Sequence, residues 1–287
     1  GNAAADTAPG EFRADHQHLK QSVGTLTPTH VSEAHAVHQA IPEELLAIAH
    51  HLDSADSILY GLILTTMKTH GEQAMKLVAS KRSTYCAKKS RDVYYLLREH
   101  PDAIRLPLLD IALSTLETLS AKTKSDILAL CDALVNVDEK FTLYEFIYIS
   151  LAEKYLSQTR EQKKTLKSYQ SVEDAIGVLL SAMVLASGNG PEAQQTIFLQ
   201  TMKRFSKKDF SPLLVRPPGV KTLSQATATL NRLSPLLKQP LIDACVDCIL
   251  HDNKVTPNEA NLLRAVCERL DCPMPLVTGA TSTPSKG

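Results

Sequence analysis

Four cysteines near the end of the chain have the residue type and spacing of a metal site. Cys245 and Cys248 form a CxxC pair, Cys267 and Cys272 follow with four residues between them, and 18 residues separate the two pairs. Four thiolates arranged as two such pairs bind structural zinc with tetrahedral geometry. The spacing alone therefore allows a zinc site.

The context of these cysteines favours a core role instead. Cys245 and Cys248 continue an apolar helical stripe that begins at Leu241, and small buried thiols are common core residues. A thioredoxin-like redox role is less favoured still, because no strand–helix–strand pattern surrounds the CxxC pair. We assign no metal ligand or cofactor to this chain and keep zinc at the four cysteines as the alternative.

Two short motifs of one form carry carboxylates. Each has an Asp, a Thr four residues later and a Glu three residues after that: Asp138, Thr142 and Glu145, then Asp252, Thr256 and Glu259. As metal ligands they are too few and too close, because an EF-hand loop spans about twelve residues with several intervening oxygens. Thr-x-x-Glu is instead the signature of a capping box, which begins a helix. We interpret both motifs as structural.

Other groups that carry chemistry are scattered. The histidines lack the H-E-x-x-H pattern that places two ligands and a Glu on one helical face. No Walker, G-x-G-x-x-G or G-x-S-x-G pattern occurs either. Two basic clusters are typical of solvated helix faces, with contact to an anionic membrane surface as the alternative. They comprise Lys81, Arg82, Lys88, Lys89 and Arg91, and then Arg160, Lys163, Lys164 and Lys167.

The elements that position these residues are predicted to be helices throughout, because nearly every apolar segment has a helical period and alternating Val/Ile-rich runs are absent. We expect Ser171 and Asp174 to cap a helix that is apolar nearly all round. The expected helices are 29–39, 42–52, 54–68, 71–79, 83–98, 107–118, 121–136, 142–157, 171–187, 191–204, 222–232, 236–250 and 256–270.

Composition sets the class of protein. The 287 residues include 31 basic and 31 acidic side chains, which argues against a nucleic-acid binder. The longest apolar run, 175–186, has about 12 residues, whereas a membrane span needs roughly 20. Polar stretches divide the chain into an expected flexible tail at 1–21, helical halves at 22–160 and 161–277, and a second tail at 278–287.

An internal repeat relates the two halves. Residues 112–156 align without a gap with residues 226–270, at an offset of 114, and 12 of 45 positions are identical. The matches keep helical phase, and one capping motif lies at the centre of each copy. The fold class is therefore predicted as all-α, with two helical units related by duplication.

The chain also resembles a known family. The segments that carry the resemblance include AHHLDSADSILYG (49–61), RLPLLDIAL (105–113) and VDEKFTLYEF (137–146), together with 22–30, 41–42, 119–120 and 171–186. They look like the soluble C-terminal region of long HtpX-like membrane zinc metallopeptidases, which include the CAAX prenyl proteases. The two repeated motifs also look like those of TerB-type helical domains, although Glu139 and Asn253 replace a Gly that is frequent there.

The resemblance implies a parent protein that is a membrane-bound metalloendopeptidase with zinc in its catalytic domain. Because the family's zinc ligands and catalytic Glu have no counterpart here, we expect this chain to be non-catalytic. It would lie on the cytoplasmic face of the bacterial inner membrane, with a regulatory, substrate-presenting or assembly role. Its partners would be the parent's transmembrane peptidase domain, and either protein substrates or the membrane surface. The alternative is a free-standing TerB-like stress-response domain that binds a divalent metal.

Overall fold

The computed structural model is all-α in the part of the chain that it describes. That part comprises residues 36–37, 39–137, 142–157, 164–208, 219–251 and 255–275. It contains 12 α-helices, one short 3-10 helix and, as its one β feature, an isolated bridge between Leu166 and Leu233. The predicted all-α class is confirmed. The expected helix at 29–39 and both expected tails lie largely or wholly outside the described residues, as does the expected boundary between the halves.

The helices predicted from residue 42 onwards are all present, with ends within two residues of those expected. In the first half they are α3 (Glu43–His50), α4 (Asp56–Thr66), α5 (Gly71–Lys81), α6 (Thr84–Arg98), η1 (Asp102–Ile104), α7 (Arg105–Leu116), α8 (Ala121–Val135) and α9 (Leu143–Leu156). In the second half they are α10 (Glu173–Ala186), α11 (Pro191–Met202), α12 (Val220–Leu230), α13 (Pro235–Ile249) and α14 (Pro257–Arg269).

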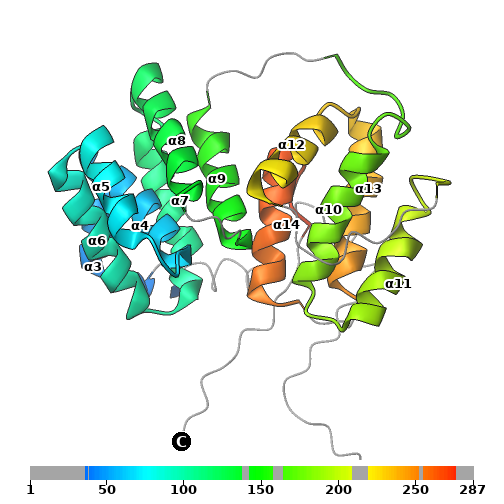
Figure 1. Ribbon diagram of the computed structural model, residues 1–287, viewed down its shortest axis with the longest axis horizontal. Coiled ribbons are helices and arrows are strands. Elements are labelled where there is room, and N and C mark those ends of the chain that lie inside the picture. The colour runs from blue at the N-terminus through cyan, green and yellow to red at the C-terminus, as the bar shows by residue number, and fades with distance from the viewer. Residues whose placement is uncertain are drawn as a thin grey trace, which may run out of the picture.

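Helix α4 is the centre of the first half. Every residue from Asp56 to Leu64 is buried, and the helix packs against α6, α7, α8 and α9 (Figure 1). Helices α4 and α6 pack closely at Gly61 because glycine has no side chain. A Cβ atom at this position would lie 2.5 Å from Cγ1 of Val93. A helix that is apolar all round has to be enclosed by others, and α4 is.

Helix α10 takes the corresponding place in the second half, where it packs against α11, α12, α13 and α14. The cap expected from Ser171 and Asp174 is wrong: Val172 is the N-cap residue, and no side chain caps this helix. Packing of an apolar helix on four neighbours fixes its start without a capping side chain. The gap between the helices expected at 171–187 and 191–204 is present, and Gly188 in it has a left-handed conformation (φ 67°).

The last two helices of the two halves have closely matching bounds. Helices α8 and α13 are offset by 114 residues at both ends, and α9 and α14 begin 114 residues apart. The offset found in the sequence therefore holds in the helices themselves.

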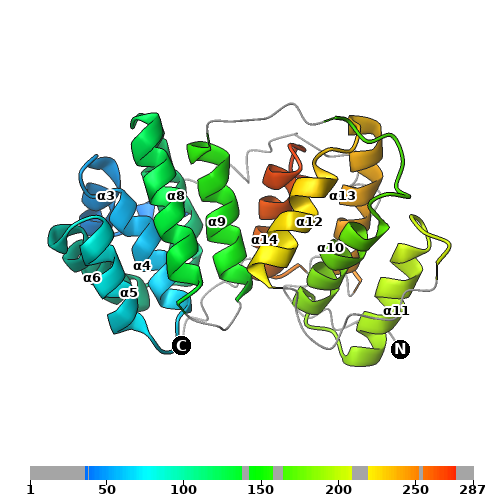
Figure 2. The same cartoon turned by 45° about the horizontal axis from the view of Figure 1, so that its top comes forward.

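Helices α9 and α14 lie side by side and join the two halves (Figures 1 and 2). Near their starts, the Tyr144 hydroxyl contacts the amide oxygen of Asn258. Near their ends, Nζ of Lys154 lies 3.6 Å from a carboxylate oxygen of Glu268. Starts meet starts and ends meet ends, so the two helices run parallel.

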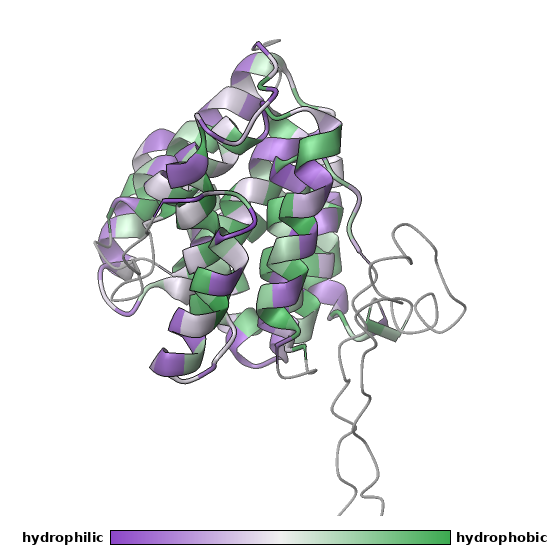
Figure 3. Ribbon diagram, turned by 90° about the vertical axis from the view of Figure 1, so that its right-hand side faces the viewer, coloured by the Kyte–Doolittle hydropathy of each residue, from purple (hydrophilic) through white to green (hydrophobic). Residues whose placement is uncertain are grey.

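The polar faces of amphipathic helices form the surface of the protein, and their apolar faces form its core. Figure 3 shows hydrophilic and hydrophobic residues mixed along the helices nearest the viewer, as expected where one face packs and the other meets water. Among the described residues, no helix is both long and apolar enough to cross a membrane.

Candidate functional site

Both capping boxes form as the sequence predicts. The Thr142 hydroxyl accepts from the Glu145 amide at 3.3 Å, and the Glu145 carboxylate accepts from the Thr142 amide at 3.3 Å. In the second copy the same two bonds join Thr256 and Glu259, at 3.3 Å and 2.6 Å. The two motifs therefore begin α9 and α14, and the parallel packing brings them to the same end of the molecule.

Glu145 has a further role that its spacing does not reveal. Its side chain is buried, and Thr66 at the end of α4 donates its hydroxyl to Glu145 Oε1 at 2.9 Å. The first capping box thereby ties α9 to the central helix of its half. This contact joins residues 79 positions apart, so local sequence pattern carried no signal for it.

The remaining residues of the two motifs, Asp138 and Asp252, lie outside the described residues. Within the described part, no group of three or more His, Cys, Asp or Glu side chains is placed to hold a metal ion. Of the histidines, His50 and His51 are exposed at the end of α3, and His30, His35 and His38 fall outside the described part.

The four cysteines of the candidate zinc pattern lie on α13, on α14 and just beyond it. Cys245, Cys248 and Cys267 are buried, and Cys272 is half-buried. Burial raises the pKa of the Cys248 thiol to about 12, and it raises the pKa values of Cys245 and Cys267 as well. A thiol that stays protonated at neutral pH behaves as a small apolar side chain, in agreement with the core interpretation.

One member of the first basic cluster forms an ion pair with a buried carboxylate. Arg82 donates from Nε and Nη2 to a carboxylate oxygen of Asp56, at 2.7 Å each, and Asp56 is buried at the start of α4. Burial raises the pKa of Asp56, against the opposing effect of Arg82. The adjacent Cys86 thiol donates to Asp56 at 3.8 Å, and burial raises its pKa to about 11. Arg82 is thus a structural residue that holds α4 against the α5–α6 turn.

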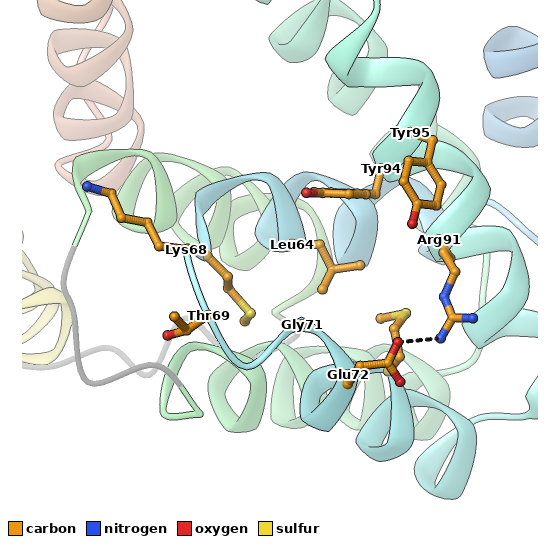
Figure 4. Close-up of a pocket in the computed structure, with 10 residues that line it drawn as sticks. Leu64, Lys68, Thr69, Gly71, Glu72, Arg91, Tyr94 and Tyr95 are labelled. Carbon is orange, nitrogen blue, oxygen red and sulfur yellow. Dashed lines mark ion pairs between the residues drawn. The ribbon is translucent and has the colours of Figure 1, made fainter.

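A concave surface lies between α5 and α6, at the outer end of the first half. Two adjoining hollows run along it and share Glu72, Met75 and Arg91. The first hollow is a cavity of about 190 Å³ at the end of α4, and Figure 4 shows Leu64 facing the tyrosines of α6 across it. It is lined by Leu64, Met67, Lys68, Thr69, Gly71, Glu72, Met75, Arg91, Tyr94 and Tyr95.

The second hollow, about 250 Å³, continues between the same two helices. It is lined by Glu72, Met75, Lys76, Ala79, Thr84, Ala87, Lys88 and Arg91. We refer to the two hollows together as the α5–α6 groove. The sequence analysis named two of its four basic residues, Lys88 and Arg91, within a charged cluster. It did not identify Lys68, Lys76 or the groove itself, because only the packing of α4, α5 and α6 makes this surface concave.

Comparison with known proteins adds no assignment: no protein-family model, no curated protein and no solved structure matches this chain.

Proposed function

We propose that this chain is the non-catalytic cytoplasmic helical domain of a membrane-bound, HtpX-like zinc metalloendopeptidase. The proposal is supported by the places that the resembling segments take. Residues 49–61 supply most of the buried length of α4, residues 105–113 form most of α7, and the 137–146 segment supplies the capping box of α9. The resemblance thus involves the packed framework of the first half rather than scattered surface positions.

The finer description of the fold belongs to the same proposal. We infer two TerB-like helical units related by an internal duplication. In its support, α8 and α13 share both ends at the offset of 114, and α4 and α10 are enclosed in the same way. The contact of Tyr144 with Asn258 joins equivalent positions of the two copies, as in a symmetric dimer whose subunits have become one chain.

Within the parent enzyme this domain would present protein substrates to the zinc-containing catalytic domain, or regulate access to it. The single observation that carries this role is the α5–α6 groove, a concave surface with apolar and basic lining. Proteolysis itself would belong to the membrane-embedded part.

Two experiments test the proposal. The reading frame upstream of residue 1 should encode membrane spans and an H-E-x-x-H motif, and their absence would contradict it. The isolated chain, incubated with casein and zinc, should show no cleavage. Activity that persists through chromatography and disappears with chelator would show that the chain is itself a protease.

The alternative, a free-standing TerB-like domain that binds a divalent metal, is favoured by one observation. The two capping motifs lie at the same end of parallel helices, so the chain enters both helices on one side. Titration with calcium, magnesium or manganese would raise the melting temperature under this alternative, because a ligand that binds only the folded state stabilises it. An unchanged melting temperature with all three ions would contradict it.

A further inference from the structure

The α5–α6 groove has the dimensions of a peptide site. Its α6 wall extends from Thr84 to Tyr95, which corresponds to about 16 Å at the rise of an α-helix. An extended peptide of about five residues covers that length. The α5 wall consists of residues at helical spacing, from Glu72 to Ala79, so the groove follows the outer seam of an antiparallel helix pair.

The lining of the first hollow has the residue types of a protein-binding surface. Leu64 and Met75 form an apolar floor, each 5% exposed, and Tyr94 and Tyr95 lie above it. Tyr95 is 56% exposed, one of only four large apolar side chains with high exposure in the described part of the chain. Tyr, Met and Arg are enriched at the centres of protein interfaces, and Met adapts its shape to different partners.

The charge of the groove selects the partner. Glu72 is the one acidic residue that lines the two hollows. Four basic residues line them as well: Lys68, Lys76, Lys88 and Arg91. The chain as a whole has zero formal charge, so this excess is local. A basic groove attracts an acidic segment and disfavours a basic one.

These charges are available to a ligand. Lys68, Lys76 and Lys88 form no ion pair with any described residue. Arg91 pairs with Glu72 at 3.5 Å, but both side chains are well exposed, at 49% and 82%. Because exposed pairs of this kind contribute little free energy, an incoming carboxylate can replace Glu72 as the partner of Arg91.

We propose that the α5–α6 groove binds an extended acidic peptide of about five residues, with one apolar side chain inserted between Tyr94, Tyr95 and the Leu64–Met75 floor. The acidic residues pair with Lys76, Lys88 and Arg91 along the second hollow. A membrane surface is disfavoured as the occupant, because a recessed floor can be reached by a single side chain but not by a flat bilayer.

This inference deepens the substrate-presenting role and rests on it for the statement that the peptide belongs to a protease substrate. Peptide binding itself is measured without any protease. Failure to bind peptide would therefore remove the groove proposal and leave the metallopeptidase assignment standing. An upstream reading frame without H-E-x-x-H would remove the metallopeptidase assignment and leave the groove proposal standing.

The test uses fluorescence anisotropy with labelled probes and the full chain. The probe is Asp-Glu-Leu-Glu-Asp, and the comparison peptides replace its Leu by Gly or its acidic residues by Lys. We expect saturable binding of the first peptide, weakening by about tenfold on loss of the Leu side chain, and no binding of the basic peptide. Equal binding of the acidic and basic peptides would overturn the proposal.

Variants locate the site. Lys76→Glu and Lys88→Glu should each weaken binding by about tenfold, and Tyr95→Ala by a similar factor. Lys122→Glu, an exposed charge reversal on α8, is the matched control and should leave binding unchanged. All four positions are exposed, so melting temperatures should stay close to that of the parent chain. An equal loss of binding in the Lys122→Glu variant would overturn the proposal, because the effect would then be one of net charge.

A binding experiment with lipid vesicles tests whether the groove binds a membrane surface instead of a peptide. Vesicles containing phosphatidylserine should bind the chain no better than vesicles of phosphatidylcholine alone. Strong binding to the anionic vesicles that is lost in Lys88→Glu, with no peptide binding, would assign the groove to the membrane and overturn the peptide proposal.

Discussion

Tyr144 and Asn258 lie 114 residues apart in the sequence, and their side chains contact each other between α9 and α14. Because this contact lies near the starts of both helices and the Lys154–Glu268 ion pair lies near their ends, the two helices pack in parallel. The interface between the halves is therefore built largely from α9 and α14. This geometry explains why the contacts at the far end also join α9 with α14.

Arg269 is the principal polar contact at that far end. Its guanidinium donates to the Glu153 carboxylate, to the Thr227 hydroxyl at 2.6 Å and to the Ser224 carbonyl at 3.0 Å, and it lies over the Phe146 ring. Arg269→Ala should lower the free energy of unfolding by about 2–3 kcal/mol, because the buried Thr227 hydroxyl and the half-buried Glu153 and Ser224 lose their donor. Arg269→Lys should recover only part of this, since Lys has no planar fork.

Urea unfolding followed by circular dichroism measures both variants. Lys122→Ala, an exposed position on α8, serves as the control and should shift the midpoint very little. If Arg269→Ala leaves the midpoint unchanged, the interface between α9, α14 and α12 is not formed as described.

The two capping threonines should contribute to stability alone. Thr142→Ala and Thr256→Ala should each cost about 0.5–2 kcal/mol, because the Glu145 or Glu259 amide loses its acceptor at the helix start. Thr→Ser at the same positions keeps the hydroxyl and should cost less. A denaturant series measures the effect, and unchanged midpoints for both Ala variants would mean that the helix starts are misplaced.

Gly61 should not tolerate a side chain. In Gly61→Ala the new Cβ would lie 2.5 Å from Cγ1 and 2.8 Å from Cβ of Val93, so α4 and α6 must separate. We expect a net loss of about 1–3 kcal/mol in the free energy of unfolding, although Ala favours a helix over Gly. Thermal melting measures it.

A second glycine provides the matched control. Gly71 lies at the start of α5, and a Cβ atom added there would meet no other atom within 4 Å, so Gly71→Ala should be neutral or stabilising. Adding Val93→Ala to Gly61→Ala removes the shortest contact and should restore part of the loss. A Gly61→Ala protein as stable as the parent would show that α4 and α6 are farther apart.

The six cysteines should differ sharply in reactivity. At pH 8 a thiol reagent should label Cys272 quickly, because that side chain is half-buried while the other five are buried. Burial also raises the pKa of Cys86 to about 11 and of Cys248 to about 12, which leaves little thiolate to react. Cys272→Ser should abolish the fast phase, and all thiols should react in urea.

The same protein, prepared without chelator, tests the zinc alternative by elemental analysis. The core role predicts no stoichiometric metal and a melting temperature that chelator does not change. Stoichiometric zinc, with Cys245→Ala unfolding the chain, would contradict the core role, because structural zinc contributes directly to folding.

Tyr148 should make the protein sensitive to alkali. Burial raises the pKa of its phenol to about 12 from an ordinary value of 10.0, with Arg105 opposing the rise. Between pH 10.0 and about 12 the phenol of Tyr148 therefore stays protonated in the folded state, whereas it is ionised in the unfolded state. The resulting stability is complete below pH 10.0 and is lost as the pH rises towards 12. In urea titrations over this pH range, the free energy of unfolding of Tyr148→Phe should fall by less than that of the parent chain, by up to about 3 kcal/mol. Parallel pH profiles for the two proteins would contradict the buried phenol.

Local sequence determined the helices and their starts. Apolar periodicity located each helix of the described part from α3 to α14, and Thr-x-x-Glu fixed the starts of α9 and α14. These features succeed because they depend on residues three or four positions apart, which a helix brings together whatever surrounds it. The similarity of residues 112–156 to residues 226–270 was also visible, since the offset of 114 is a property of the sequence alone.

Tertiary structure decided which of these helices meet. The parallel pairing of α9 with α14, the bond from Thr66 to Glu145, the use of Arg82 to neutralise buried Asp56 and the groove between α5 and α6 all join residues that are distant in sequence or lie on separate helices. Ser171 failed as a cap for the same reason, because packing around α10 outweighs a local preference. The type and spacing of side chains define which face of a helix can be buried. Which other helix packs on that face depends on the complementary shapes of the two whole helices. A short stretch of sequence contains only one helix of such a pair, so it cannot specify the pairing.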